Sequence, residues 1–123
     1  MDRARVARWL KIYVEAWETY DRDKIADLFS EDATYRYHPY DEPVRGRDAI
    51  VRSWLEEPDA TGTYEATYEP IVVEGDVAVA VGNSVYRGAD GTIEKTYDNC
   101  FVMRFDDDGR CRDFTEWYMK RPT

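Results

Sequence analysis

The chain has 123 residues, of which 43% are hydrophobic and 15% aromatic, enough apolar material for the core of one compact domain. Its formal net charge of −9 disfavours nucleic acid and anionic membrane surfaces as partners. We find no apolar run long enough to span a bilayer and no signal-peptide core, so we expect a soluble, cytoplasmic protein with a single domain over residues 1–123.

Two helices are expected at the start of the chain, and a third after a short strand. Between residues 3 and 20, apolar residues recur at helical spacing with charged residues between them: Val6, Trp9, Leu10, Tyr13, Val14 and Trp17. Asp21 is placed to cap a second helix over residues 23–29. We expect a strand over residues 33–37 and a third helix over residues 47–57, which the following proline ends.

The second half of the chain has the pattern of four long strands joined by tight turns. We expect these strands over residues 63–73, 77–87, 92–105 and 110–120. Strands joined in this way pair as an antiparallel meander. The whole pattern predicts an α+β domain, in which three N-terminal helices pack on one face of a curved antiparallel sheet.

The last hairpin allows a finer prediction. A two-residue turn at Asp107 and Asp108 would set the register of its strands. The cross-strand pairs are then Phe101–Phe114, Asn99–Glu116 and Tyr97–Tyr118, all on one face of the sheet. A turn one residue longer would send each of the later side chains to the opposite face.

The two cysteines, Cys100 and Cys111, flank this turn. In the predicted register Cys111 lies opposite Arg104, about 13 Å along the strand from Cys100, which is too far for a disulfide. We therefore expect two free thiols, as is usual in a reducing compartment. No spacing of cysteine and histidine suggests zinc, and the acidic turn at residues 106–108 is typical of solvated residues, so no metal or cofactor is expected.

Both faces of the predicted sheet carry apolar residues, so both should be covered. The face that bears Trp117 and Met119 would be an exposed apolar patch in a monomer. We expect the helices to cover one face and a second copy of the chain to cover this one, which gives a homodimer.

Three stretches resemble the nuclear transport factor two-like superfamily, and within it the SnoaL-like and ketosteroid-isomerase-like domains. They are DKIADLFSEDATY (residues 23–35), PVRGRDAI (residues 43–50) and VMRFDDDGR (residues 102–110). The resemblance implies a cone-shaped fold around a cavity. The superfamily includes isomerases, dehydratases, polyketide cyclases, hydrolases and proteins that only bind, so the fold leaves the activity open.

The match to ketosteroid isomerases can be followed residue by residue. In that family a tyrosine on the first helix binds a developing oxyanion, and Tyr13 has the matching position. The position of the family's aspartate base is occupied by Tyr37, and that of its second, protonated acid by Phe101. The resemblance therefore does not support that mechanism, but it places Phe101, together with the face of Asn99 and Glu116, inside the cavity.

Three polar residues are candidates for chemistry in such a cavity. Glu116 would lie among aromatic rings, where lost solvation raises the pKa of a carboxyl towards the range of a general acid or base, with Asn99 to orient it; the alternative is a buried structural glutamate. His38, the only histidine, adjoins the missing base position and can transfer protons near neutral pH, or it orders the turn beside Pro39. Tyr13 can donate a hydrogen bond to a substrate oxygen, or it is one more core aromatic.

The expected ligand contacts are mostly aromatic: Trp17, Tyr37, Trp54, Asn99, Phe101 and Tyr118. They suit a small, hydrophobic, ring-bearing molecule. Three functions stay open: a cofactor-independent isomerase, dehydratase or cyclase that works by proton transfer, a binding protein without turnover, and a dimeric scaffold whose cavity is filled by its own side chains.

Overall fold

The computed structural model of the chain describes residues 1–122 apart from 57 and 61. Its elements in chain order are α1 (Arg3–Thr19), α2 (Arg22–Leu28), β1 (Phe29–Arg36), β2 (Val44–Arg45), α3 (Arg47–Glu56), β3 (Tyr64–Glu74), β4 (Val77–Arg87), β5 (Ile93–Phe105) and β6 (Cys111–Lys120). The α+β prediction is confirmed, and the predicted end of the third helix at residue 57 lies outside the described residues. None of the described helices is long and apolar enough to cross a bilayer.

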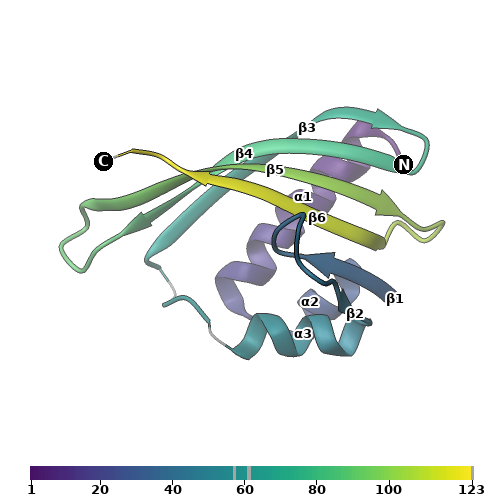
Figure 1. Cartoon of the computed structure of the whole chain (residues 1–123), viewed down its shortest axis with the longest axis horizontal. Helices are drawn as coiled ribbons and strands as arrows, with labels where there is room; N and C mark the ends of the chain where they lie inside the picture. The colour runs from purple at the N-terminus through teal and green to yellow at the C-terminus, as the bar shows by residue number, and fades with distance from the viewer. Residues whose placement is uncertain (57, 61, 123) are drawn as a thin grey trace.

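All six strands belong to one curved sheet in the order β2-β1-β6-β5-β4-β3. Figure 1 shows α1 running along one side of the long strands, with α2 and α3 grouped near β1 and β2. Two details differ from the prediction: α3 follows the first two strands, and β1 pairs with β6 in parallel. No hairpin links β1 to β6, so no local turn dictates the direction of that pair.

The first two helices begin at aspartate caps. The side chain of Asp2 accepts a hydrogen bond from the backbone N–H of Arg5 at 2.8 Å. The side chain of Asp21 accepts from the N–H groups of Asp23 and Lys24, which confirms its predicted role. Each cap satisfies donors that have no partner within the helix, a contribution of about 1 kcal/mol.

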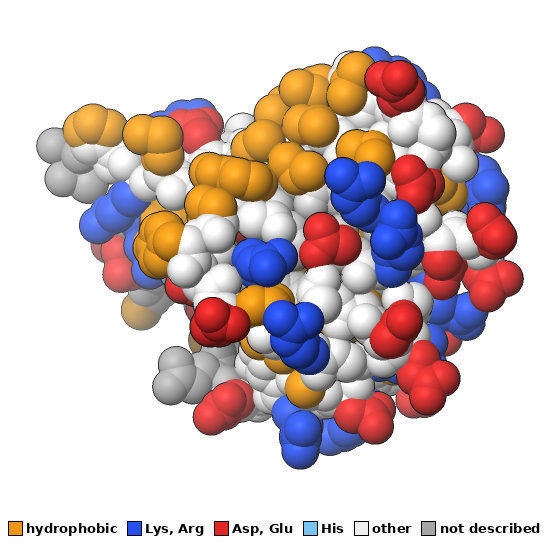
Figure 2. All heavy atoms as spheres, turned by 45° about the vertical axis from the view of Figure 1, so that its right-hand side comes forward, with side chains coloured by type: hydrophobic (Ala, Val, Ile, Leu, Met, Phe, Trp, Pro, Cys, Tyr) orange, Lys and Arg blue, Asp and Glu red, His pale blue; other side chains and the backbone are white. Residues whose placement is uncertain are grey.

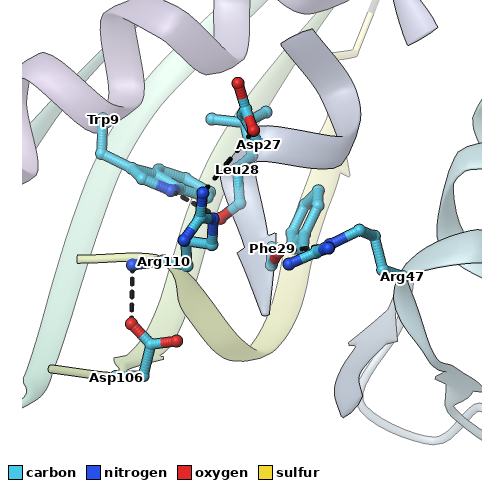
Figure 3. A network of polar contacts seen from close by, with 7 residues as sticks. All are labelled: Trp9, Asp27, Leu28, Phe29, Arg47, Asp106 and Arg110. Carbon is cyan, nitrogen blue, oxygen red and sulfur yellow. Dashed lines mark hydrogen bonds and ion pairs between the residues drawn. The ribbon is translucent and has the colours of Figure 1, made fainter. Parts of the chain in front are cut away.

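A polar network ties the start of β1 to the rest of the molecule (Figure 3). The indole Nε1–H of Trp9 donates to the carbonyl of Leu28, and Arg47 Nε donates to the carbonyl of Phe29, at 3.0 Å in both cases. Arg110, on the β5–β6 turn, forms an ion pair with Asp27 of α2. These contacts hold α1, α3 and the last hairpin around the point where the chain passes from α2 into the sheet.

The register of the β5–β6 hairpin differs from the predicted one by two residues. Phe101 lies opposite Glu116 and Asn99 lies opposite Tyr118. The first residue of this difference comes from the turn, which is one residue longer than expected, because Phe105 pairs with Cys111. The second comes from an irregularity between Phe105 and Arg104, where one residue of β6 is left without a partner. Each single-residue shift would reverse the faces, but the two together restore them, so Glu116 still shares a face with Asn99.

Both cysteines are free, as the spacing predicted. Cys111 is fully buried, and burial raises the pKa of its thiol. Cys100 is partly buried on the other face of β5. Neither thiol has the lowered pKa that marks a reactive cysteine.

Candidate functional site

A cavity of about 580 Å³ lies between the helices and the inner face of the sheet and opens to solvent. Its size is within the range of small-molecule sites. Its walls contain eight of the ten tyrosines. The lining consists of Tyr13, Trp17, Tyr20, Tyr35, Tyr37, Ser53, Trp54, Glu56, Asp59, Tyr68, Ser84, Tyr86, Lys95, Tyr97, Asn99, Glu116 and Tyr118.

The alternation of the strands explains how the sheet contributes to this lining. Successive side chains of a strand point to opposite faces, so residues two apart share a face. On β5 the inward residues Lys95, Tyr97 and Asn99 line the cavity, and on β6 Glu116 and Tyr118 do so. The cavity therefore extends along the inner face of the last two strands.

One glycine permits a close approach in the cavity wall. A Cβ atom at Gly82 of β4 would lie 1.9 Å from the carbonyl oxygen of Thr67 and 2.6 Å from Cδ1 of Tyr68. Only a residue without a side chain fits this space. Gly82 thus lets the Tyr68 ring lie against the β4 backbone, beside Asn99, which pairs with Gly82 on the other side.

A short hydrogen-bonded chain holds Glu116. Ser84 Oγ donates to Asn99 Oδ1 at 3.1 Å, and Asn99 Nδ2 donates to Glu116 Oε2 at 2.7 Å. Among the described residues, none donates a hydrogen bond to Glu116 Oε1. One carboxylate oxygen is therefore held in place, and the other is available to a ligand.

The surroundings of Glu116 favour its neutral form. Burial raises the pKa of this carboxyl from 4.5 to about 7, although the hydrogen bond from Asn99 and the charge of His38 both lower it. Lost solvation is the largest of these effects, because the carboxyl is buried in a cavity lined mainly by aromatic rings. A carboxyl with a pKa near 7 can both accept and donate protons at neutral pH.

Two tyrosine hydroxyls meet deep in the same cavity. Tyr13 Oη lies 3.1 Å from Tyr35 Oη, and both side chains are buried. Burial raises the pKa of both hydroxyls well above the usual value, so both stay protonated. The pair shares one hydrogen bond, which leaves one O–H that can point to a ligand oxygen.

The cavity lining carries charged groups of both signs. Asp59 accepts hydrogen bonds from Trp17 Nε1 at 3.2 Å and from the Tyr20 hydroxyl at 3.5 Å. The ammonium of Lys95 lies 4.8 Å from the ring centre of Tyr86, a cation–π contact. The lining is thus more polar than the apolar pocket expected from the sequence.

His38 lies outside the cavity lining. Its Nδ1 is 2.8 Å from Asp41 Oδ2, and its Nε2 is 2.7 Å from the hydroxyl of Tyr118, which does line the cavity. His38 is therefore linked to the cavity lining through the hydroxyl of Tyr118.

The structure brings seven of the nine residues expected at the site into the cavity lining: Tyr13, Trp17, Tyr37, Trp54, Asn99, Glu116 and Tyr118. Tyr37 Oη lies 2.6 Å from Ser53 Oγ of α3. Phe101 is fully buried behind the lining, with its ring 4.5 Å from that of Tyr68 and 4.8 Å from that of Phe114.

Several residues of the cavity lining were not predicted from the sequence. Tyr35 precedes Tyr37 by two residues and Tyr86 occupies an inward position of its strand, so strict alternation could have found both. Tyr97 was expected on the inner face but not among the ligand contacts. Asp59 follows α3 in a segment without a periodic pattern, and no signal in the sequence points to it. Among the described residues, no group of three or more histidine, cysteine, aspartate or glutamate side chains could hold a metal ion.

Comparison with solved structures finds the same fold in known proteins. An NTF-2-like protein of unknown function from Burkholderia xenovorans superposes with a TM-score of 0.74 at 18% identity, covering 98% of this chain and 87% of that one. A candidate ketosteroid isomerase from Kribbella flavida superposes with a TM-score of 0.73 at 17% identity, covering 99% of this chain and 83% of that one. At such identities the likeness shows the fold alone.

The sequence comparisons agree with this placement. No curated protein gives a significant match to the chain. The model of the SnoaL-like domain matches residues 10–114, most of the length of the chain. The chain therefore belongs to the SnoaL-like domain family, within the nuclear transport factor two-like superfamily.

Proposed function

We propose that the cavity binds a small, ring-bearing, largely hydrophobic molecule and that Glu116 moves a proton to or from it. One observation carries the proposal: a carboxyl with a pKa near 7 lies in a ring-lined cavity with one oxygen held by Asn99 and the other available. The reaction classes that such a group serves are isomerisation, dehydration and cyclisation, and none of them needs a cofactor.

The remaining groups suit a substrate with a carbonyl or hydroxyl oxygen. If a ring carbon releases its proton to Glu116, negative charge develops on a nearby oxygen. The free O–H of the Tyr13–Tyr35 pair can donate to that oxygen from a site with little water, where such a hydrogen bond is strongest. Trp54 stands edge-on to Tyr13 at 5.1 Å and closes this part of the wall.

A carrier or binding protein without turnover is the second candidate. It is favoured by the comparison with ketosteroid isomerases, because Tyr37 and Phe101 occupy the positions of the two catalytic acids of those enzymes. The two candidates differ in a measurable way, because a binding protein needs no group that accepts a proton from its ligand.

The test uses 5-nitrobenzisoxazole, a flat aromatic compound that reports on a base near a ring-binding site. A base takes the proton from its C3 carbon, the C–H electron pair forms the nitrile, and the N–O bond breaks to release a coloured phenolate. We expect turnover at pH 8 to fall at least about 100-fold in Glu116→Gln, as for loss of a general base. The matched control is Glu69→Gln on the exposed side of β3, which should keep full turnover.

Binding is measured separately with 2-naphthol by fluorescence. If both the wild type and Glu116→Gln bind 2-naphthol but only the wild type turns over 5-nitrobenzisoxazole, the catalytic function is supported. Binding with equal turnover in both would assign the protein to the carrier class. Absence of 2-naphthol binding to either protein would contradict a ring-binding cavity.

We also propose that two copies of the chain associate through the outer face of the sheet. Figure 2 shows hydrophobic side chains in a band that runs from the level of β3 towards the end of the chain, with charged side chains over much of the rest. Trp117 and Met119 of β6 are 44% and 76% exposed, and Val72 of β3 is 54% exposed. Covering these side chains removes apolar surface that a monomer would leave in water.

A cytoplasmic location stays a prediction. It is supported by the two free cysteines, which an oxidising compartment would tend to pair or modify.

A further inference from the structure

The turn between β1 and β2 is joined to β6 by a chain of two side-chain contacts. Asp41 Oδ2 lies 2.8 Å from His38 Nδ1, and His38 Nε2 lies 2.7 Å from the hydroxyl of Tyr118. The His38 carbonyl accepts the backbone N–H of Asp41 at 3.1 Å, which closes the turn and holds the two side chains together. The imidazole stacks on Tyr40, with ring centres 5.0 Å apart, and lies 4.9 Å from the ring of Tyr118.

The three side chains connect solvent to the cavity. The side chains of His38 and Asp41 are 31% and 36% exposed, and Tyr118, which lines the cavity, is itself 38% exposed. Tyr118 and Glu116 are two residues apart on β6, so they share a face with their backbones about 7 Å apart. The charge of His38 also lowers the pKa of Glu116, which places the imidazole within electrostatic reach of that carboxyl.

The contacts dictate how each proton is placed. A carboxylate at Asp41 can only accept, so Nδ1 of the imidazole carries a proton. When the imidazole is neutral, Nε2 is an acceptor and takes the hydrogen bond of the Tyr118 O–H, so the phenol oxygen presents only lone pairs to the cavity. When the imidazole is charged, Nε2–H donates to the phenol oxygen, and the Tyr118 O–H is free to donate to a ligand.

We propose that Asp41, His38 and Tyr118 form a proton relay between solvent and the cavity, and that Tyr118 is the second proton-transfer group beside Glu116. The relay rests on the proposed function and adds a second proton-transfer group to the same site. In this scheme Tyr118 touches the substrate, whereas His38 and Asp41 are positioning residues that act through it.

The proton steps balance within these groups. Glu116 takes a proton from a substrate carbon, and the Tyr118 O–H gives its proton to a substrate oxygen. The Nε2 proton of the imidazolium then passes to the phenol oxygen, and the neutral imidazole keeps its Nδ1–H on Asp41. His38 recovers its proton from solvent, and Glu116 releases its own. The substrate class is therefore a cyclic compound with an oxygen function close to an acidic C–H, such as a ring ketone.

The hydrogen bonds of the relay can be observed directly because the chain has one histidine. Protein without an affinity tag, labelled with ¹⁵N in histidine alone, gives one pair of ring nitrogen signals. For the neutral imidazole, we expect the Nδ1–H tautomer in the wild type. In Tyr118→Phe that tautomer should persist while the Nε2 signal moves, because its O–H donor is lost. Asp41→Asn should reduce the preference for Nδ1–H, and Asp107→Asn in the exposed hairpin turn is the matched control that should leave both signals in place.

The functional arm measures deuterium uptake by 2-tetralone, a ring ketone with acidic hydrogens beside its carbonyl. We expect Tyr118→Phe and Asp41→Asn each to lower the enzyme-dependent uptake at least about 10-fold, while 2-naphthol binding by Asp41→Asn, whose changed side chain lies outside the lining, stays within about twofold of wild type.

Two results would overturn the relay. One is a dominant Nε2–H tautomer, or nitrogen signals that are the same in Tyr118→Phe as in the wild type. The other is uptake that depends on Glu116 but not on Tyr118 or Asp41, and in that case the proposed function would stand without the relay. A failure of the proposed function looks different, since the turnover of 5-nitrobenzisoxazole would then be the same in Glu116→Gln as in the wild type.

Discussion

Replacing Glu116 with glutamine should make the free energy of unfolding less dependent on pH. In the folded protein burial raises the pKa of this carboxyl from 4.5 to about 7. Between these two values the unfolded chain has released the proton while the folded chain still holds it. Because the unfolded state then binds fewer protons, the wild type loses stability as pH rises from about 4.5 to about 7, and the loss is complete above that range.

The size of this effect follows from the same two values. At about 1.36 kcal/mol per pKa unit, their separation corresponds to about 3 kcal/mol. The glutamine amide can still accept the hydrogen bond from Asn99 Nδ2 through its oxygen, so the substitution removes the charge and keeps the main contact. Between pH 4.5 and pH 8, the free energy of unfolding of Glu116→Gln should therefore rise by about 3 kcal/mol relative to that of the wild type.

Urea unfolding at pH 4.5 and at pH 8 measures this change. With the usual slope of about 1–3 kcal/mol per molar urea for a small protein, the midpoint difference between variant and wild type should change by about 1–3 M. The exposed Glu69→Gln serves as the control and should differ from the wild type equally at both pH values. A constant difference between Glu116→Gln and the wild type at both pH values would refute a buried, ionisable carboxyl at this position.

Three further changes test other parts of the account. Asn99→Leu removes the donor that lowers the pKa of Glu116, so the pH midpoint of 5-nitrobenzisoxazole turnover should rise above that of the wild type; an unchanged midpoint would remove Asn99 from the site. Gly82→Ala places a Cβ within 1.9 Å of a backbone oxygen of β3, so chemical denaturation should show a loss of about 1–3 kcal/mol or more, whereas wild-type stability would contradict the close approach. Trp117→Glu puts charge on the outer sheet face, so light scattering should find a monomer that still binds 2-naphthol; a wild type that is itself monomeric at micromolar concentration would exclude the proposed dimer.

The helices and long strands were predictable because their signals are local. The apolar stripe of α1, the cap at Asp21 and the turn glycines between the long strands each specify an element through nearby residues. The two-residue strand β2 and the first residues of β1 were missed. They have no such pattern, and their pairing depends on contacts that form only in the complete fold.

The orientation of Glu116 was predicted correctly, although the register behind that prediction was wrong. Its inward orientation was expected from a register that proved to be wrong by two residues, and the expected face was right because a shift of two preserves alternation. The bulge that supplies the second residue of the shift has no signal in the sequence. Contacts between distant segments, such as Asp59 with Trp17 or His38 with Tyr118, arise from the closure of the sheet over the helices and could not be found from spacing.

A ¹³C titration of the glutamate side-chain carboxyls, with the Glu116 signal assigned by its absence in Glu116→Gln, tests the central claim most directly. We expect this one carboxyl to titrate with a midpoint near 7. A midpoint below about 5, in the ordinary range of a solvated glutamate, would contradict the claim and leave the cavity without a group suited to proton transfer at neutral pH.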